Sequence, residues 1–117
     1  MENQFDINQA KKFLENRESL IMEKSEQERS YVLKKAIHCL EELFAHTNVE
    51  VYLVGSITKP YTFHPRSDVD IVVKNFTGDR FDLWTKLETL IGKNVEVILF
   101  ENCHFQEHVL KSGYKVL

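Results

Sequence analysis

The sequence lacks the features of disulfide-stapled, secreted and membrane-spanning proteins. Its two cysteines, Cys39 and Cys103, stand far apart and belong to no paired-cysteine motif. No apolar run exceeds four residues, whereas a membrane-spanning helix needs about 20. The first twenty residues mix acidic and basic side chains and contain no apolar signal core. We therefore expect a soluble, cytoplasmic protein with reduced thiols and no membrane partner.

An excess of positive charge is also missing. Fifteen Lys and Arg residues stand against eighteen Asp and Glu residues, for a net charge of −3. Such a chain has no overall attraction for nucleic acid or an anionic membrane, so any cationic phosphate site must be local. Hydrophobic residues make up 43% of the 117 residues, which excludes a largely disordered chain and allows one compact domain.

Glycine and proline are absent from the first 46 residues, and this segment predicts helix. Asp6 with Gln9 resembles a capping box, and Ser25 with Glu28 resembles a second one. The residues leave open whether Ser25 starts a new helix or lies inside one long helix.

The hydrophobic period then changes from helical to strand-like. Strands are predicted at 49–54, 69–74 and 95–100, and an edge strand at 114–117. Between them we expect a loop at 55–67 with a helical turn, and helices at 81–91 and 102–112. This order predicts an α/β (α+β) fold, a small mixed sheet with packed helices preceded by N-terminal helices. We interpret residues 1–24 as an N-terminal helical extension and residues 25–117 as the main domain.

The main candidate site residues are three carboxylates. Asp68 and Asp70 stand two positions apart at the start of a predicted buried strand, so both should project from one side. Two carboxylates held this close repel each other unless a cation lies between them, and such a pair suits Mg²⁺. Glu96 lies inside another apolar strand and would share that cation if the two strands are neighbours.

A possible phosphate site precedes these acids. Gly55 and Ser56 end the first predicted strand, where a residue without a Cβ lets backbone approach a phosphate and a hydroxyl can donate to it. The following loop adds Lys59, His64 and Arg66 as local positive charge. Each feature alone is compatible with an ordinary turn or solvated surface. Their order along the chain favours a functional site.

Other conspicuous side chains are expected to be structural. Phe81, Trp84 and Leu87 recur at core spacing and should pack on the sheet. His104 and His108 have the spacing of zinc ligands on a helix, but no third ligand is evident, so a helix face is favoured.

The segments Val54–Ser56 and Ser67–Ile71 together resemble the Gly-Ser and Asp-x-Asp signature of the DNA polymerase β-type nucleotidyltransferase superfamily. The short chain resembles its smallest members, the minimal nucleotidyltransferase (MNT) antitoxins that accompany HEPN-domain toxins. The strand around Glu96 is similar to the family's later strand with a third carboxylate. The spacer at 57–67 is one residue longer than usual, and Glu96 replaces a more frequent aspartate.

The resemblance implies a polymerase β-type fold and Mg²⁺-dependent transfer of AMP from ATP to a tyrosine hydroxyl of a cognate HEPN ribonuclease toxin. It implies that Asp68, Asp70 and Glu96 are the catalytic residues and hold two Mg²⁺ ions. The nucleotide would be bound by residues of the loop and its two ends: Gly55, Ser56, Lys59, Arg66 and Ser67.

Two alternatives remain at this point: a non-catalytic antitoxin that masks its toxin by binding, and an accessory subunit of a larger nucleotidyltransferase. The charge balance argues against a long nucleic acid as acceptor, and the short chain leaves no second domain for a small molecule. A protein acceptor in a hetero-oligomer with the toxin fits best, with the N-terminal helix as a partner-binding arm.

Overall fold

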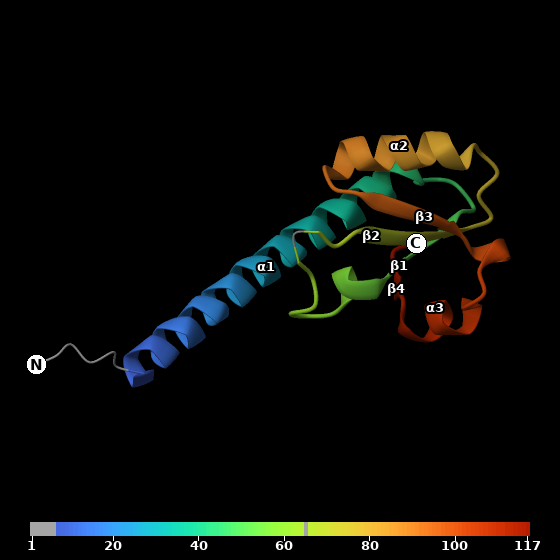
Figure 1. The fold of residues 1–117 in the computed structure, drawn as a ribbon. Coiled ribbons are helices and arrows are strands. Elements are labelled where there is room, and N and C mark those ends of the chain that lie inside the picture. The colour runs from blue at the N-terminus through green and yellow to red at the C-terminus, as the bar shows by residue number, and fades with distance from the viewer. Residues whose placement is uncertain (1–6, 65) are drawn as a thin grey trace, which may run out of the picture.

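The computed structural model describes residues 7–64 and 66–117 (Figure 1). Four strands and three α-helices alternate with two short 3₁₀ helices. In chain order they are α1 (Ile7–Leu43), β1 (Glu50–Val54), η1 (Gly55–Thr58), β2 (Val69–Lys74), α2 (Arg80–Ile91), β3 (Val95–Leu99), η2 (Phe100–Asn102), α3 (Gln106–Ser112) and β4 (Tyr114–Lys115).

The described part of the N-terminal segment forms one continuous helix, α1. This decides the question left open at Ser25: from residue 7 onward one helix precedes the sheet, whereas the predicted fold class had N-terminal helices. A capping serine stabilises a helix start only where backbone N–H groups lack partners, and no Gly or Pro frees them here. The capping box at Asp6 lies outside the described residues. Although α1 is long, no helix in the described ranges is apolar enough over its length to cross a membrane.

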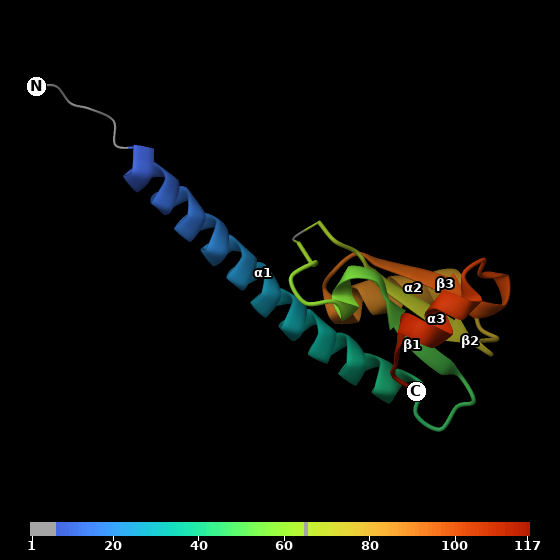
Figure 2. The same ribbon diagram turned by 90° about the horizontal axis from the view of Figure 1, so that it is seen from below.

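Only the C-terminal half of α1 packs on the rest of the molecule. The buried residues of α1 are Arg29, Val32, Ala36 and Leu40. The N-terminal half projects away as an arm, which gives the molecule extents of 74 × 28 × 20 Å (Figures 1 and 2). Six large apolar side chains on this arm are each more than half exposed: Ile7, Phe13, Leu14, Leu20, Ile21 and Met22.

The four strands form one mixed sheet in the order β3-β2-β1-β4. β1 pairs antiparallel with β2 and with β4, whereas β2 and β3 are parallel. The predicted α+β class with a small mixed sheet is confirmed. The condition stated for Glu96 is met, because its strand β3 lies beside β2, which carries Asp70. The final edge strand is shorter than predicted, at Tyr114–Lys115.

The sheet has two unequal faces. One face is covered by α1 and α2, and its core includes Leu53, Ile71 and Val97, all fully buried. The other face is covered in part by α3, whose Val109 packs with Tyr52, Val54, Val72 and Phe100. Because α3 is short, the second face is only partly covered, and that opening holds the candidate site.

Helix α2 begins at a clear cap and ends at a glycine. The side chain of Asp79 accepts hydrogen bonds from the backbone N–H groups of Phe81 and Asp82, and Gly92 closes the helix with a φ of 77°. Leu87 is buried as predicted. The prediction that Phe81 packs on the sheet is wrong, because Phe81 is 70% exposed. It lies two residues from buried Leu83 and therefore on the opposite side of the helix.

Candidate functional site

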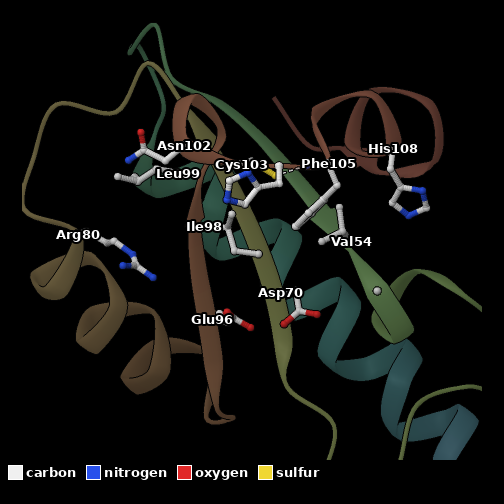
Figure 3. A pocket seen from close by; sticks show the side chains of 12 residues that line it. Val54, Asp70, Arg80, Glu96, Ile98, Leu99, Asn102, Cys103, Phe105 and His108 are labelled. Carbon is white, nitrogen blue, oxygen red and sulfur yellow. Dashed lines mark hydrogen bonds between the residues drawn. The ribbon is translucent and has the colours of Figure 1, made fainter.

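Strand pairing brings Asp70 and Glu96 together. Val54 in β1 pairs with Asp70 in β2, and Asp70 pairs with Glu96 in β3. The three side chains therefore form a row across one face of the sheet, the face that α3 covers in part. Asp70 is half-buried in this row and Glu96 is exposed. Figure 3 shows the two carboxylates side by side on neighbouring strands.

Asp68 lies just outside the sheet. It is exposed and directly precedes β2, which begins at Val69. The parallel ladder with β3 also begins at Val69, opposite Val95, so Asp68 has no strand partner. Its charge still acts on the row, since Asp68 is one of the two carboxylates that raise the pKa of Asp70. The sequence placed all three acids near one another, and the structure adds that only Asp70 and Glu96 are paired by the sheet.

The pKa of Asp70 is raised from its ordinary value of 3.8 to about 6. Partial burial is the largest cause, followed by the charge of Glu96 and then that of Asp68. All three causes disfavour the ionised carboxylate, and a bound cation would reverse them.

Gly55 brings the backbone against Asp70. Its φ is 80°, a left-handed conformation that glycine adopts readily. A Cβ at this position would lie 2.7 Å from Oδ2 of Asp70, closer than the contact allows. The absence of a side chain therefore lets the carboxylate of Asp70 lie against the turn that begins η1.

A pocket of about 560 Å³ opens over this row. Gly55, Asp70 and Glu96 line it from the sheet, and Arg80 lines it from the start of α2. The opposite wall comes from Asn102 in η2, from Cys103 and Phe105 between η2 and α3, and from His108 on α3 (Figure 3). His104 also lines the pocket. The pocket thus has carboxylates on one side and imidazole, guanidinium and aromatic groups on the others.

The remaining predicted site residues do not line this pocket. They are Ser56, Lys59, Arg66, Ser67 and Asp68. Lys59 and Arg66 are exposed on the loop between η1 and β2. Ser67 closes a turn of that loop, because its Oγ accepts a hydrogen bond from the backbone N–H of His64 at 3.0 Å. Their contact with a nucleotide stays a prediction.

Arg80 is a site residue that sequence analysis did not single out. Its Nε donates to the carbonyl oxygen of Val97 at 2.8 Å, and its Cζ lies 5.5 Å from the ring centre of Trp84. These contacts hold the guanidinium at the pocket, where its other N–H groups can bind an anion. Arginine is a common surface residue at the start of a helix, so no sequence signal distinguishes Arg80 as a site residue.

His104 and His108 also differ from their expected role. The sequence predicted both residues on one helix, but His104 lies in the turn before α3 and only His108 lies on the helix. Both line the pocket opposite the carboxylates.

The donor set of the row suits a hard divalent cation. Carboxylate oxygens are the ligands that Mg²⁺ prefers, and the crowded charge around Asp70 favours one. Across residues 7–64 and 66–117, no three His, Cys, Asp or Glu side chains already meet as a metal-binding cluster. A cation here would therefore rest first on the paired Asp70 and Glu96, with Asp68 and water or phosphate oxygens completing its shell.

The raised pKa of Asp70 predicts a pH-dependent cost to folding. Because folding raises this pKa, the contribution of Asp70 to stability is fully present below pH 3.8 and lost as pH rises through about 6. Asp70→Asn should therefore leave the free energy of unfolding nearly unchanged at about pH 4 and raise it by about 1 kcal/mol at about pH 7.5, a figure discounted for solvent exposure. Urea denaturation at both pH values measures this.

Glu41→Gln is the control for the loss of one negative charge, because it removes an exposed carboxylate on α1 rather than one in the site. An equal gain in both variants would contradict a specific role for the crowding at Asp70.

No protein-family model and no curated protein matches the sequence. Among solved structures, the chain is similar to one in the crystal structure of the toxin–antitoxin complex MntA–HpeT, studied as a variant with two Asp→Glu substitutions two positions apart. The TM-score is 0.53 at 22% identity, over 69% of this chain and 69% of that chain. The two chains share a fold. The observed architecture, a small mixed sheet with packed helices, agrees with the α+β class that the sequence predicted.

Proposed function

We propose that this protein is a Mg²⁺-dependent nucleotidyltransferase that acts as an antitoxin. It would transfer AMP from ATP to a tyrosine hydroxyl of a cognate HEPN-domain toxin. The observation that carries the proposal is the Asp70–Glu96 pair, set against the backbone of Gly55 at the edge of a pocket. The fold shared with a chain of a toxin–antitoxin complex supports the antitoxin role.

Asp68, Asp70 and Glu96 are the residues that would hold the two Mg²⁺ ions. When bound, magnesium neutralises triphosphate oxygens and lowers the pKa of an attacking hydroxyl. In the transfer, the acceptor hydroxyl gives up its proton and its oxygen bonds to the α-phosphorus of ATP. The bond between the α-phosphorus and the oxygen that bridges to the β-phosphorus breaks, and pyrophosphate leaves with that oxygen.

The chain's own residues would orient the reactants. Gly55 lets the carboxylate of Asp70 lie against the turn, while Ser56 and Ser67 at the ends of the loop would donate hydroxyl hydrogen bonds to phosphate. Lys59 and Arg66 would add positive charge from the exposed loop. The pocket wall around Arg80 would face the acceptor, on the side of Glu96 away from the Gly-Ser turn.

The test is transfer itself. The protein is incubated with Mg²⁺, each nucleoside triphosphate in turn, and the product of the neighbouring gene, and the intact masses of both proteins are measured. We expect the partner to gain one or more AMP units with ATP. No mass gain with any nucleotide, while the partner is still bound and neutralised, would contradict the enzyme and support a masking antitoxin.

The masking antitoxin is a second candidate because of the arm of α1. The N-terminal half of this helix carries six large apolar side chains that are each more than half exposed. Such a stripe favours binding to another protein, and binding alone could neutralise a toxin.

Mg²⁺ and ATP together should raise the melting temperature of the protein. A ligand that binds only the folded state at about a hundred times its Kd adds about 2.7 kcal/mol, which is several degrees for a domain of this size. Thermal unfolding with Mg²⁺, with ATP and with both measures the shift. Asp70→Asn is the matched control and should lose the part of the shift that needs both ligands. No shift at millimolar concentrations would contradict a competent nucleotide site.

A further inference from the structure

Helix α1 is tied directly to the Gly-Ser turn of the site. Nη1 of Arg29 donates a hydrogen bond to the carbonyl oxygen of Ile57 in η1, at 2.8 Å. Arg29 is 9% exposed, and it precedes Ile57 by 28 residues in the sequence. A buried charge is costly unless it is paired and hydrogen-bonded, so a specific contact must hold this guanidinium.

Glu26 supplies that contact and a second tie to the loop. Its carboxylate accepts hydrogen bonds from Nε of Arg29 at 2.9 Å and from Nη2 at 2.6 Å. Oε2 of Glu26 also accepts from the backbone N–H of Tyr61 at 2.7 Å. Arg29 and this N–H hold the pKa of Glu26 at about 2, so Glu26 is ionised at neutral pH. The two residues together fix the loop at Ile57 and at Tyr61.

The loop backbone has an unusual conformation at Tyr61, and side chains bind the carbonyl oxygens of its first turn. Tyr61 has a φ of 63°, a conformation that is uncommon for a bulky residue and persists only where surrounding contacts hold it. Three successive carbonyl oxygens of the turn, those of Gly55, Ser56 and Ile57, accept from side chains of Thr58, Thr62 and Arg29 respectively. Because each peptide unit is planar and trans, a fixed carbonyl also fixes the direction of the next N–H group. These N–H groups belong to the turn that faces Asp70.

We propose that Glu26 and Arg29 are a positioning pair: they hold the turn that begins at Gly55 in the orientation that nucleotide binding needs. The proposal rests on the proposed function for the identity of the ligand. It makes the C-terminal half of α1 part of the site's framework, although α1 packs on the opposite face of the sheet from Asp70 and Glu96.

The test uses two conservative variants and one matched control. Arg29→Lys keeps the charge but cannot bond to Ile57 and Glu26 in the same forked geometry. Glu26→Gln keeps the shape and removes the ion pair. Glu42→Gln is the control, since Glu42 lies on the same helix and its exposed carboxylate pairs within the helix, with His38 at 3.1 Å.

Loop order is measured by tryptic cleavage after exposed Arg66, relative to cleavage after Lys74. Lys74 is the last residue of β2 and pairs with Glu50 of β1, so cleavage there reports opening of the sheet. We expect this ratio to rise about tenfold in Arg29→Lys and Glu26→Gln and to stay at the wild-type value in Glu42→Gln. In the same two variants, KM for ATP should rise about tenfold with a smaller change in kcat, because the loop loses its bound orientation rather than its chemistry.

The possible outcomes distinguish a failure of the positioning role from a failure of the proposed function. Wild-type cleavage ratios in both variants, or an equal rise in Glu42→Gln, would overturn the positioning role. An opened loop with an unchanged KM for ATP would overturn it too. The cleavage assay needs no nucleotide or partner. If the wild-type protein transfers nothing and the two variants still open the loop, the proposed function fails while the tie between α1 and the loop stands.

Discussion

Asp70→Asn is expected to abolish nucleotidyl transfer while the protein stays folded. Asp70 is the central carboxylate of the site, paired with Glu96 across the sheet and in contact range of the Gly55 backbone. A neutral amide cannot supply the charge that a divalent cation needs, and a loss of several kcal/mol in transition-state stabilisation lowers kcat by about a thousandfold or more. Transfer of labelled AMP to the partner measures this.

Substitutions of the two neighbouring acids, Asp68 and Glu96, should impair transfer to different degrees. Asp68→Asn should also abolish transfer, because Asp68 is, with Glu96, one of the two carboxylates whose charges act on Asp70. Glu96→Gln should cripple transfer but spare nucleotide binding, since its expected role concerns the attacking hydroxyl. In cells, an Asp68→Ala protein should still bind the toxin and fail to detoxify it. Full protection by that variant would show that masking, not transfer, neutralises the toxin.

Gly55→Ala should disable the site by a different route. The new Cβ would lie 2.7 Å from Oδ2 of Asp70, and the residue would have to keep a φ of 80° or shift the turn. We expect the free energy of unfolding to fall by about 1–3 kcal/mol and transfer to drop by at least about a hundredfold, because either the carboxylate or the turn must move. Urea denaturation and the transfer assay measure the two effects.

Gly92→Ala is the matched control for this change. Gly92 has a φ of 77°, nearly the same backbone conformation, but its Cβ would lie 3.7 Å from Nζ of Lys35 and far from any carboxylate of the site. It should lose comparable stability and keep full transfer in the folded fraction. Equal transfer by both glycine variants would contradict the close contact between Gly55 and Asp70.

Three residues that line the pocket, Gly55, Asp70 and Glu96, were predictable because their sequence signals are local. A β-branched run that stops at Gly55, and acids two positions apart before an apolar run, are visible in any window of ten residues. The pocket wall was not predictable. Arg80, His104 and Phe105 come from separate segments, and each has ordinary neighbours in the sequence.

The sequence by itself determined the strands, the glycine turn and the order of the three acids, because side-chain period and backbone freedom act over a few residues. Tertiary structure alone decided that Ser25 continues a helix, that Phe81 faces solvent, and that Glu26 and Arg29 reach the loop. It also set the row of Val54, Asp70 and Glu96. Cross-strand register and contacts between distant segments depend on how all the apolar faces are buried at once, and no local pattern encodes that.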